Sequence, residues 1–181
     1  MDNINRPGTE KAVIMDGNAV GRAIARITYE ILERNKGSDN LCIIAIMSGG
    51  LNIASRICAK INELENTAVP CGALDITAYR DDERHSPDCD KTCIDFDVTG
   101  KKVIIVDDVI FTGRSARAAI DALMKRGRPQ CIQLAVLVDR GHRELPIRPD
   151  YVGKNVPTSR DESVKVIMGG ENNADKVVIL E

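Results

Sequence analysis

The sequence predicts an α/β fold in which a mainly parallel sheet is flanked by helices on both faces. Three stretches are apolar on successive residues, as in strands buried on both faces: LCIIAIM at 41–47, KVIIVD at 102–107 and CIQLAVLVD at 131–139. Segments with apolar residues at helical spacing alternate with these runs. This alternation implies right-handed crossovers between parallel strands, and ligands of such folds bind at the carboxyl ends of the strands.

The N-terminal part is predicted as strand, helix, strand and helix. KAVIMD at 11–16 is short and apolar, as in a strand, and Asp16 or Asn18 can cap the helix that follows. That helix has apolar residues on one face, Arg and Glu on the other, and ends near Gly37. After the first buried strand, the turn SGG leads into a second helix of about 51–65.

The same order then returns. VPCGALDITAYR at 69–80 is predicted as a strand, and the polar stretch 81–99 as a long loop. A helix over 113–126, ending near Gly127, separates the second buried strand from the third.

The tail departs from this alternation. Prolines break up 140–160, and VKVIMG at 164–169 with KVVIL at 176–180 predicts two closing strands. With 181 residues and 43% hydrophobic content, the chain is long enough to bury one core, so we expect a single domain over 1–181.

Composition excludes some classes of protein. The formal net charge is -2, so bulk charge does not indicate a nucleic-acid partner, although a local basic face is compatible with that sum. No segment has the apolar length of a membrane span or the pattern of a secretory signal. We therefore expect a cytoplasmic protein with no membrane partner, and most of its six cysteines lie in apolar runs as small core residues do.

The stretch VIIVDDVIFTGRS at 103–115 combines acidic residues with a helix start. Asp107 and Asp108 end a buried strand, and TGRS opens the next helix. A helix start offers unpaired N–H groups to a phosphate, and neighbouring carboxylates accept hydrogen bonds from vicinal hydroxyls. A ribose 5-phosphate site is the functional interpretation. The simpler one, a strand end followed by a helix cap, accounts for most matches to such dipeptides taken alone.

The whole string resembles the phosphoribosyl pyrophosphate (PRPP) motif of the type I phosphoribosyltransferases. The resemblance implies a flexible loop, for which 81–99 is the candidate, a pyrophosphate-binding turn at 47–50, and a small hood formed by the tail. It also implies that PRPP binds together with Mg²⁺.

The resemblance assigns roles to particular residues. Asp107 and Asp108 hold the ribose hydroxyls, and Arg80 closes over the site from the base of the loop. The 5-phosphate is held by Thr112, Gly113, Arg114 and Ser115, and the pyrophosphate by the backbone of Ser48, Gly49 and Gly50. The uracil edge meets Val138, Asp139 and Arg140, mostly through backbone groups.

Other stretches resemble one branch of this family, the bacterial attenuation proteins of pyrimidine operons that also act as uracil phosphoribosyltransferases. DRGHRELPIRPDYVGKN at 139–155 is the most specific. The resemblance implies a homodimer or higher homo-oligomer that binds the operon's mRNA leader with UMP or UTP and makes UMP from uracil and PRPP. The candidate RNA-binding residues are Arg22, Arg26, Arg34, His142, Arg143 and Lys154.

Two departures from that branch keep alternatives open. The pyrophosphate turn usually reads K-T-R-G there, whereas Met47-Ser48-Gly49-Gly50 carries no cation. Loss of the arginine removes a bidentate donor to pyrophosphate, although purine enzymes use a comparable G-G turn through its backbone. A regulator without transferase activity and a purine salvage enzyme are the alternatives. Ala25 and Tyr29 replace the usual Thr and His on the RNA-facing helix.

The loop raises a metal question. His85, Cys89 and Cys93 recur at four-residue intervals and could supply three zinc ligands. The spacing is not that of a usual zinc pair, so we favour incidental loop cysteines and predict no metal site there.

Overall fold

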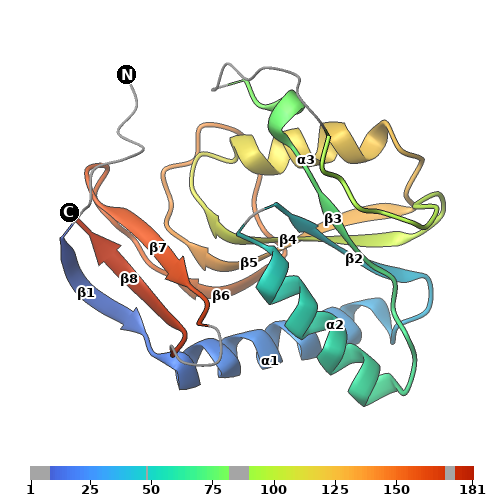
Figure 1. The fold of residues 1–181 in the computed structure, drawn as a ribbon, viewed down its shortest axis with the longest axis horizontal. Coiled ribbons are helices and arrows are strands. Elements are labelled where there is room, and N and C mark those ends of the chain that lie inside the picture. The colour runs from blue at the N-terminus through green and yellow to red at the C-terminus, as the bar shows by residue number, and fades with distance from the viewer. Residues whose placement is uncertain (1–8, 48, 82–89, 170–173) are drawn as a thin grey trace.

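The computed structural model describes residues 9–47, 49–81, 90–169 and 174–181. They form a five-stranded parallel sheet in the order β3-β2-β4-β5-β6 and a three-stranded antiparallel sheet in the order β1-β8-β7 (Figure 1). The main sheet comprises β3 (Cys71–Leu74), β2 (Leu41–Ile46), β4 (Lys102–Ile110), β5 (Cys131–Asp139) and β6 (Tyr151–Asn155). The small sheet comprises β1 (Glu10–Met15), β8 (Lys176–Leu180) and β7 (Ser163–Ile167).

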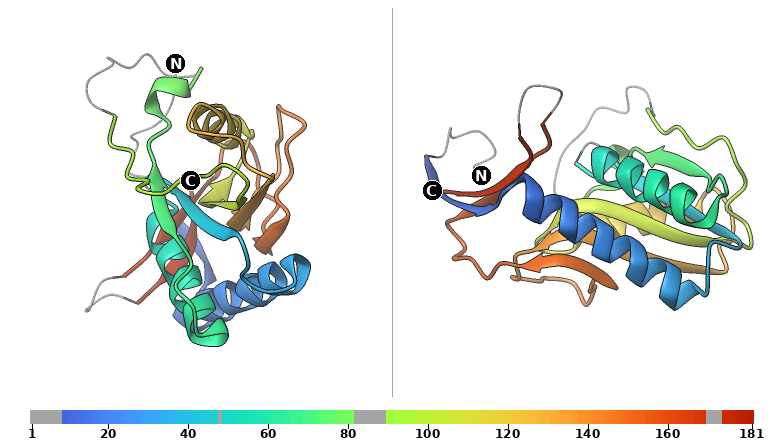
Figure 2. Two further views of the ribbon diagram at one scale, coloured as in Figure 1. Left: turned by 90° about the vertical axis from the view of Figure 1, so that its right-hand side faces the viewer. Right: turned by 90° about the horizontal axis from the view of Figure 1, so that it is seen from below.

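Helices cover both faces of the main sheet, as the alternation of patterns predicts. Figure 1 shows α1 (Gly17–Asn35) and α2 (Leu51–Glu65) on one face and α3 (Arg114–Met124) on the other, and the views in Figure 2 agree. The predicted α/β fold with a mainly parallel sheet is therefore confirmed.

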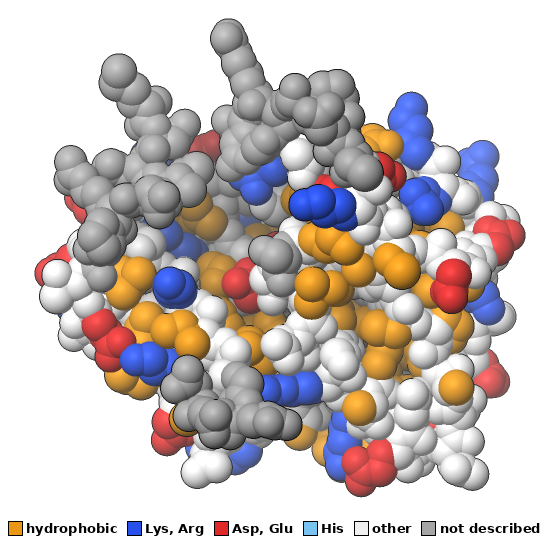
Figure 3. All heavy atoms as spheres, viewed as in Figure 1, with side chains coloured by type: hydrophobic (Ala, Val, Ile, Leu, Met, Phe, Trp, Pro, Cys, Tyr) orange, Lys and Arg blue, Asp and Glu red, His pale blue; other side chains and the backbone are white. Residues whose placement is uncertain are grey.

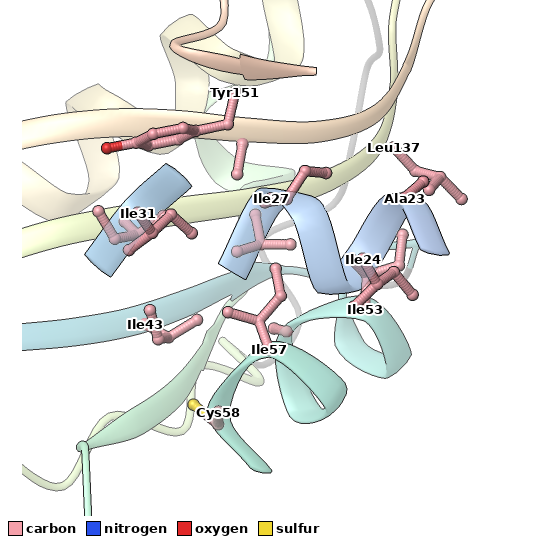
Figure 4. Close-up of a cluster of buried hydrophobic side chains, with 14 of the residues drawn as sticks. Ala23, Ile24, Ile27, Ile31, Ile43, Ile53, Ile57, Cys58, Leu137 and Tyr151 are labelled. Atoms are coloured by element: carbon pink, nitrogen blue, oxygen red, sulfur yellow. The ribbon is translucent and has the colours of Figure 1, made fainter. Parts of the chain in front are cut away.

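Two apolar layers hold these elements together. The first lies between the sheet and the α1–α2 pair, where Ile27, Ile31, Ile43 and Ile57 are fully buried (Figure 4). The second lies under α3 and is built from alternate residues of the same strands, such as Ile44 and Ile105. Burial on both faces explains why these strands are apolar at every position.

Several predicted boundaries were wrong. The strand expected over 69–80 ends at Leu74, because the Asp75 carboxylate accepts hydrogen bonds from the Thr77 backbone and hydroxyl and starts a short 3₁₀ turn, Thr77–Tyr79. The strand expected to stop at Asp107 continues to Ile110, since its last residues still pair with β5.

The small sheet was only partly predicted. Strands were expected near β1, β7 and β8, but the pairing of β1 with β8 was not predicted. The half-polar strand β6 was missed altogether, because it is an edge strand of five residues that follows a proline-rich stretch. The small sheet contacts the main body through β4 and β7 and occupies the place expected for the hood.

A buried polar cluster joins α1 to β5 and β6. The Asn35 amide donates to Gln133 over 3.0 Å, and the Tyr151 hydroxyl donates to the same Gln133 oxygen over 2.5 Å. Because the three side chains satisfy one another, the end of α1 is fixed over the edge of the sheet.

No helix within the described ranges is long and apolar enough to cross a membrane.

We expect Ile27→Ala to lower the free energy of unfolding by about 2–5 kcal/mol, because Ile27 is fully buried between α1 and the sheet. Urea denaturation monitored by circular dichroism measures the change. Leu64→Ala, on the 38% exposed position of α2, is the control and should cost about 0.5 kcal/mol or less. Equal losses for both variants would contradict the assigned core.

Candidate active site

A cavity of about 450 Å³ lies at the carboxyl edge of the main sheet. The end of β4, the start of α3 and the loop that follows β5 surround it. Figure 3 shows a separate recess between the small sheet and the main body; no residue of the small sheet belongs to the lining of the cavity. The lining includes most of the motif at 103–115, with Arg80 and Glu144 from two loops: Arg80, Asp107, Val109, Ile110, Phe111, Thr112, Gly113, Arg114, Ser115, Ala116, Leu134, Val136 and Glu144.

The two acidic residues of the motif do not share one environment. Because β4 continues through them, their side chains leave on different sides of the strand. Asp107 lines the cavity, whereas the Asp108 carboxyl group lies against Gly49 in the turn between β2 and α2. The pair therefore links the cavity to that turn, which the expectation of two equivalent ribose ligands did not include.

Burial raises the pKa of Asp107 well above its ordinary range, and the negative charge of Asp108 raises it further. The positive charge of Arg80 and the backbone N–H of Asp108, which donates to Asp107 over 2.9 Å, oppose this change. Asp107 is thus a partly buried carboxyl group that gains from a polar or cationic ligand.

The start of α3 has free backbone donors. Gly113 precedes the helix with φ +94°, a conformation that favours glycine, and makes no side-chain cap; the Arg114 N–H has only a long hydrogen bond, 3.4 Å, to the Thr112 hydroxyl. By contrast, the Asp16 carboxylate caps α1 by accepting from the Ala19 N–H over 2.7 Å. The first turn of α3 and the Thr112 and Ser115 hydroxyls line the cavity, which suits a phosphate group.

The turn between β2 and α2 makes a second uncapped helix start. Gly50 precedes α2 without a side-chain hydrogen bond. A β-carbon at Gly50 would overlap the Val106 carbonyl oxygen, and one at Gly49 would overlap the Asp108 carboxyl group. Both glycines are therefore required by the close approach of the turn to β4. Ser48, the third predicted member of the turn, lies outside the described residues.

Arginines connect the cavity to its loops. Arg80 approaches the Ser115 hydroxyl, with 3.5 Å between Nη1 and Oγ. Arg114 forms ion pairs with Asp81 over 2.8 Å and with Glu144 over 2.9 Å. Its side chain is thus paired with carboxylates rather than directed at the helix start, and only its backbone is placed as expected for a phosphate ligand. The sequence pattern gave no signal for Glu144.

The loop after β5 presents backbone more than side chains. Val138 is fully buried, and the Arg140 guanidinium is buried over the Phe111 ring, 4.0 Å from its centre. Arg140 also donates to the Thr158 hydroxyl and the Ser159 carbonyl. Asp139 pairs with Arg143 over 2.5 Å. The side chains of this loop mainly hold its shape, in keeping with the expectation of backbone contacts.

The candidate RNA-binding residues fall into two groups. Arg22, Arg26 and Arg34 lie exposed on α1, next to Lys154 of the adjoining β6, and the Arg26 guanidinium donates to the Gly153 carbonyl. The second group is turned inward: Arg143 donates to the Phe111 carbonyl over 2.7 Å, and His142 Nε2 lies 2.6 Å from the Thr158 carbonyl oxygen.

The first group has an aromatic neighbour, Tyr29. Tyr29 is 52% exposed on α1, seven residues from Arg22 and three from Arg26, so it shares their helix face.

Two of the three residues considered as zinc ligands and not favoured, His85 and Cys89, lie outside the described residues. Cys93 is described and forms an isolated β-bridge with Ala73.

The cavity at the edge of the parallel sheet has the features of a phosphoribosyl site: an uncapped helix start, a carboxyl group and a cation. The family model for the phosphoribosyl transferase domain matches residues 12–167, and the chain belongs to that family. Within it, the curated relatives carry the name "Bifunctional protein PyrR". The Caldicellulosiruptor bescii protein is 56% identical over 92% of this chain and 93% of its own, and the Acetivibrio thermocellus protein is 60% identical over 87% of each. The chain is a member of the PyrR family.

Solved structures show the same fold at low identity. The hypoxanthine phosphoribosyltransferase of Trypanosoma cruzi matches with a TM-score of 0.72 and 19% identity over 94% of this chain and 97% of its own. A hypoxanthine-guanine phosphoribosyltransferase from Bacillus anthracis matches with a TM-score of 0.71 and 21% identity over 96% and 99%. These likenesses support the fold and carry no information on the base.

We expect Asp107→Asn to stabilise the free protein by about 1 kcal/mol at pH 7.5, a gain typical of replacing a strained functional group. The raised pKa means that folded Asp107 keeps its proton over a range where the unfolded chain has lost it. Its contribution to stability is therefore present at low pH and lost as pH rises through that range.

Urea denaturation at pH 4 and pH 7.5 tests this sign. The variant and the wild type should converge at pH 4 and diverge at pH 7.5. Asp95→Asn, at an exposed loop residue, is the control: its free energy of unfolding should change between pH 4 and pH 7.5 by as much as that of the wild type. If Asp107→Asn is stabilised equally at both pH values, the raised pKa of Asp107 is not the cause of the stabilisation.

Proposed function

We propose that the protein binds the leader of a pyrimidine-operon mRNA when UMP or UTP is abundant, and also converts uracil and PRPP to UMP and pyrophosphate. One observation carries the phosphoribosyl part: the start of α3, which has no side-chain cap at Gly113, and Asp107 line one cavity. The regulatory part rests on membership of the PyrR family.

The transfer breaks the bond from C1 of the ribose to pyrophosphate and forms a bond from C1 to N1 of uracil. We assign the 5-phosphate to the backbone of Gly113, Arg114 and Ser115 with the Thr112 hydroxyl. Asp107 accepts hydrogen bonds from the ribose hydroxyls, and its charge favours the cationic ring that forms as the leaving group departs. Asp108 stands between the ribose and the turn, where it positions Gly49.

The pyrophosphate lies at the start of α2 in this scheme. No cation belongs to the described residues of the turn, so its N–H groups and the helix dipole do the holding. Arg80 adds positive charge on the cavity side and helps to exclude water. Val138, Asp139 and Arg140 present backbone groups to the edge of uracil.

The residues at the cavity fit a magnesium ion that arrives with PRPP. The Asp107 carboxylate at the cavity and the oxygens of a polyphosphate are ligands of the kind that Mg²⁺ prefers when it keeps several waters. The described residues contain no cluster of three or more His, Cys, Asp or Glu side chains that would form a complete cage. When bound, the ion neutralises charge on the leaving group.

We expect release of pyrophosphate from PRPP with uracil but not with guanine or hypoxanthine. Asp107→Asn should lower kcat/KM for uracil by about 100-fold or more, because it removes a charge that matters most in the transition state. Asp95→Asn is the matched control and should retain wild-type activity. Turnover with a purine and not with uracil would overturn the assignment. No turnover with any base, together with tight UMP binding, would favour a regulator without transferase activity.

The RNA surface is assigned to the exposed face of α1 and the adjoining β6. Arg22, Arg26, Arg34 and Lys154 supply positive charge there, and Tyr29 supplies an exposed ring on which an unpaired base can stack. His142 and Arg143 act indirectly, since both fix the loop that meets the nucleotide. That loop offers a route by which bound UMP affects the RNA surface, because β6 follows it directly.

We propose a homo-oligomer in which two such surfaces lie side by side and extend the basic face. Action on nascent transcripts, as proposed, implies a cytoplasmic location.

We expect Arg22→Ala to weaken binding of a pyrimidine-operon leader RNA in the presence of UMP and to reduce the salt slope by about one, because it removes a phosphate contact. Tyr29→Ala should lose about 1–3 kcal/mol of binding, while Tyr29→Phe retains the ring and the affinity. Fluorescence anisotropy at several salt concentrations measures both.

Lys125→Ala is the control, since Lys125 is exposed at the end of α3 on the opposite face of the sheet. A loss for Lys125→Ala equal to that for Arg22→Ala would place the RNA elsewhere. RNA affinity that is indifferent to UMP would reject the regulatory model.

A further inference from the structure

Two cysteines meet between α2 and β3, away from the cavity lining. Cys58 lies on α2 with 6% of its surface exposed, and Cys71 is the exposed first residue of β3. The two side chains belong to elements that contact each other, α2 and β3, and each thiol is the main cause of the change in the other's pKa. Figure 4 shows the Cys58 sulfur at the margin of the apolar cluster rather than in its centre. One thiol is thus open to solvent and its neighbour is protected.

The sheet register explains why these side chains face each other. Cys71 pairs directly with Ile43 of the parallel strand β2, so both side chains leave the same face of the sheet. Ile43 belongs to the apolar layer beneath α1 and α2, which also contains Cys58. The Cys71 side chain is therefore directed toward α2. β3 is the edge strand of the sheet; Cys93 bridges it at Ala73, and Cys71, two residues earlier, remains exposed.

We propose that Cys58 and Cys71 form a hydroperoxide-reactive thiol pair, in which exposed Cys71 is oxidised first and buried Cys58 then closes a disulfide between α2 and β3. Cys131 shows the contrast within the same chain. It is also an exposed first residue of a strand, but its sulfur has a Gln133 amide as its neighbour rather than a second thiol.

The acidities of the two groups agree with this order. The hydrogen bond from Cys58 lowers the pKa of Cys71 to about 7, so about half of Cys71 is thiolate near neutral pH. The same bond, together with burial, raises the pKa of Cys58, which therefore remains the protonated donor.

Both steps balance with a hydroperoxide as the oxidant. The Cys71 thiolate attacks the distal oxygen, the O–O bond breaks, and the products are a sulfenic acid and an alkoxide or hydroxide that takes up a proton. Cys58 loses its proton and attacks the Cys71 sulfur, the S–O bond breaks, and water leaves. The hydroperoxide gains two electrons, and the two sulfurs lose one each.

The test uses the whole reduced protein treated with hydrogen peroxide at pH 7.5, followed by peptide mapping without reductant. We expect a linked Cys58–Cys71 peptide within one chain, loss of two hydrogens from the intact mass, and reversal by dithiothreitol. Alkylation by iodoacetamide at pH 7 should be about tenfold faster at Cys71 than at Cys131. Cys131→Ser is the matched control and should oxidise as the wild type does.

Cys71→Ser should abolish the linked peptide and leave Cys58 reduced. Cys58→Ser should leave Cys71 as a sulfenic acid that dimedone traps; if this variant fails to fold, Cys71→Ser and the wild-type map decide the question. Oxidation of Cys71 in parallel with Cys131 and without a link would overturn the proposal. So would a link from Cys71 to Cys93 or to a second chain.

Discussion

The backbone of the turn at Gly49 and Gly50 packs so closely against β4 that a β-carbon fits at neither position. This approach fixes the distance between the two helix starts, because α2 begins at the turn and α3 begins just beyond the end of β4. The two sets of free N–H groups then lie at one edge of the sheet. The proposed recognition of phosphate at two points thus depends on the absence of side chains at these positions.

Electrostatics follows from the same approach. Asp108 is held against the turn while Asp107 lines the cavity, so two acidic side chains are kept close together with Arg80 as the cation near Asp107. Adjacent like charges destabilise the free protein, and a ligand that carries hydroxyls and a divalent cation relieves the repulsion. The site is therefore arranged for its occupied state, as expected for groups whose environments are strained in the absence of ligand.

Much of this arrangement could be predicted from the sequence, and the errors have physical causes. The strands at 41–47 and 131–139 are buried on both faces, so an unbroken apolar run identified them. The length of β4 was underestimated because Asp107 and Asp108 interrupt the apolar run while the backbone pairing with β5 continues. Pairing with a neighbour is a property of the fold, and no local pattern reports it.

The candidate site was predicted by position more completely than by orientation. The motif at 103–115 lines the cavity as expected. The partners of Arg114 and Arg143 were not foreseen, because Glu144, Asp81 and Asp139 are ordinary acidic residues in sequence and only the tertiary structure pairs them. An arginine in a loop can bind a ligand or stabilise the loop, and the choice depends on carboxylates that are distant along the chain or in another element.

The glycine at position 49 also limits how this sequence can change over generations. Resembling proteins usually have an arginine there, but in this chain any larger residue would meet the Asp108 carboxyl group. Restoring the arginine therefore requires Asp108 to adopt a different rotamer or the turn to move away from β4, and neither is a single conservative step. Positions 49 and 108 are therefore coupled, and the residue present at one of them determines which substitutions the other tolerates.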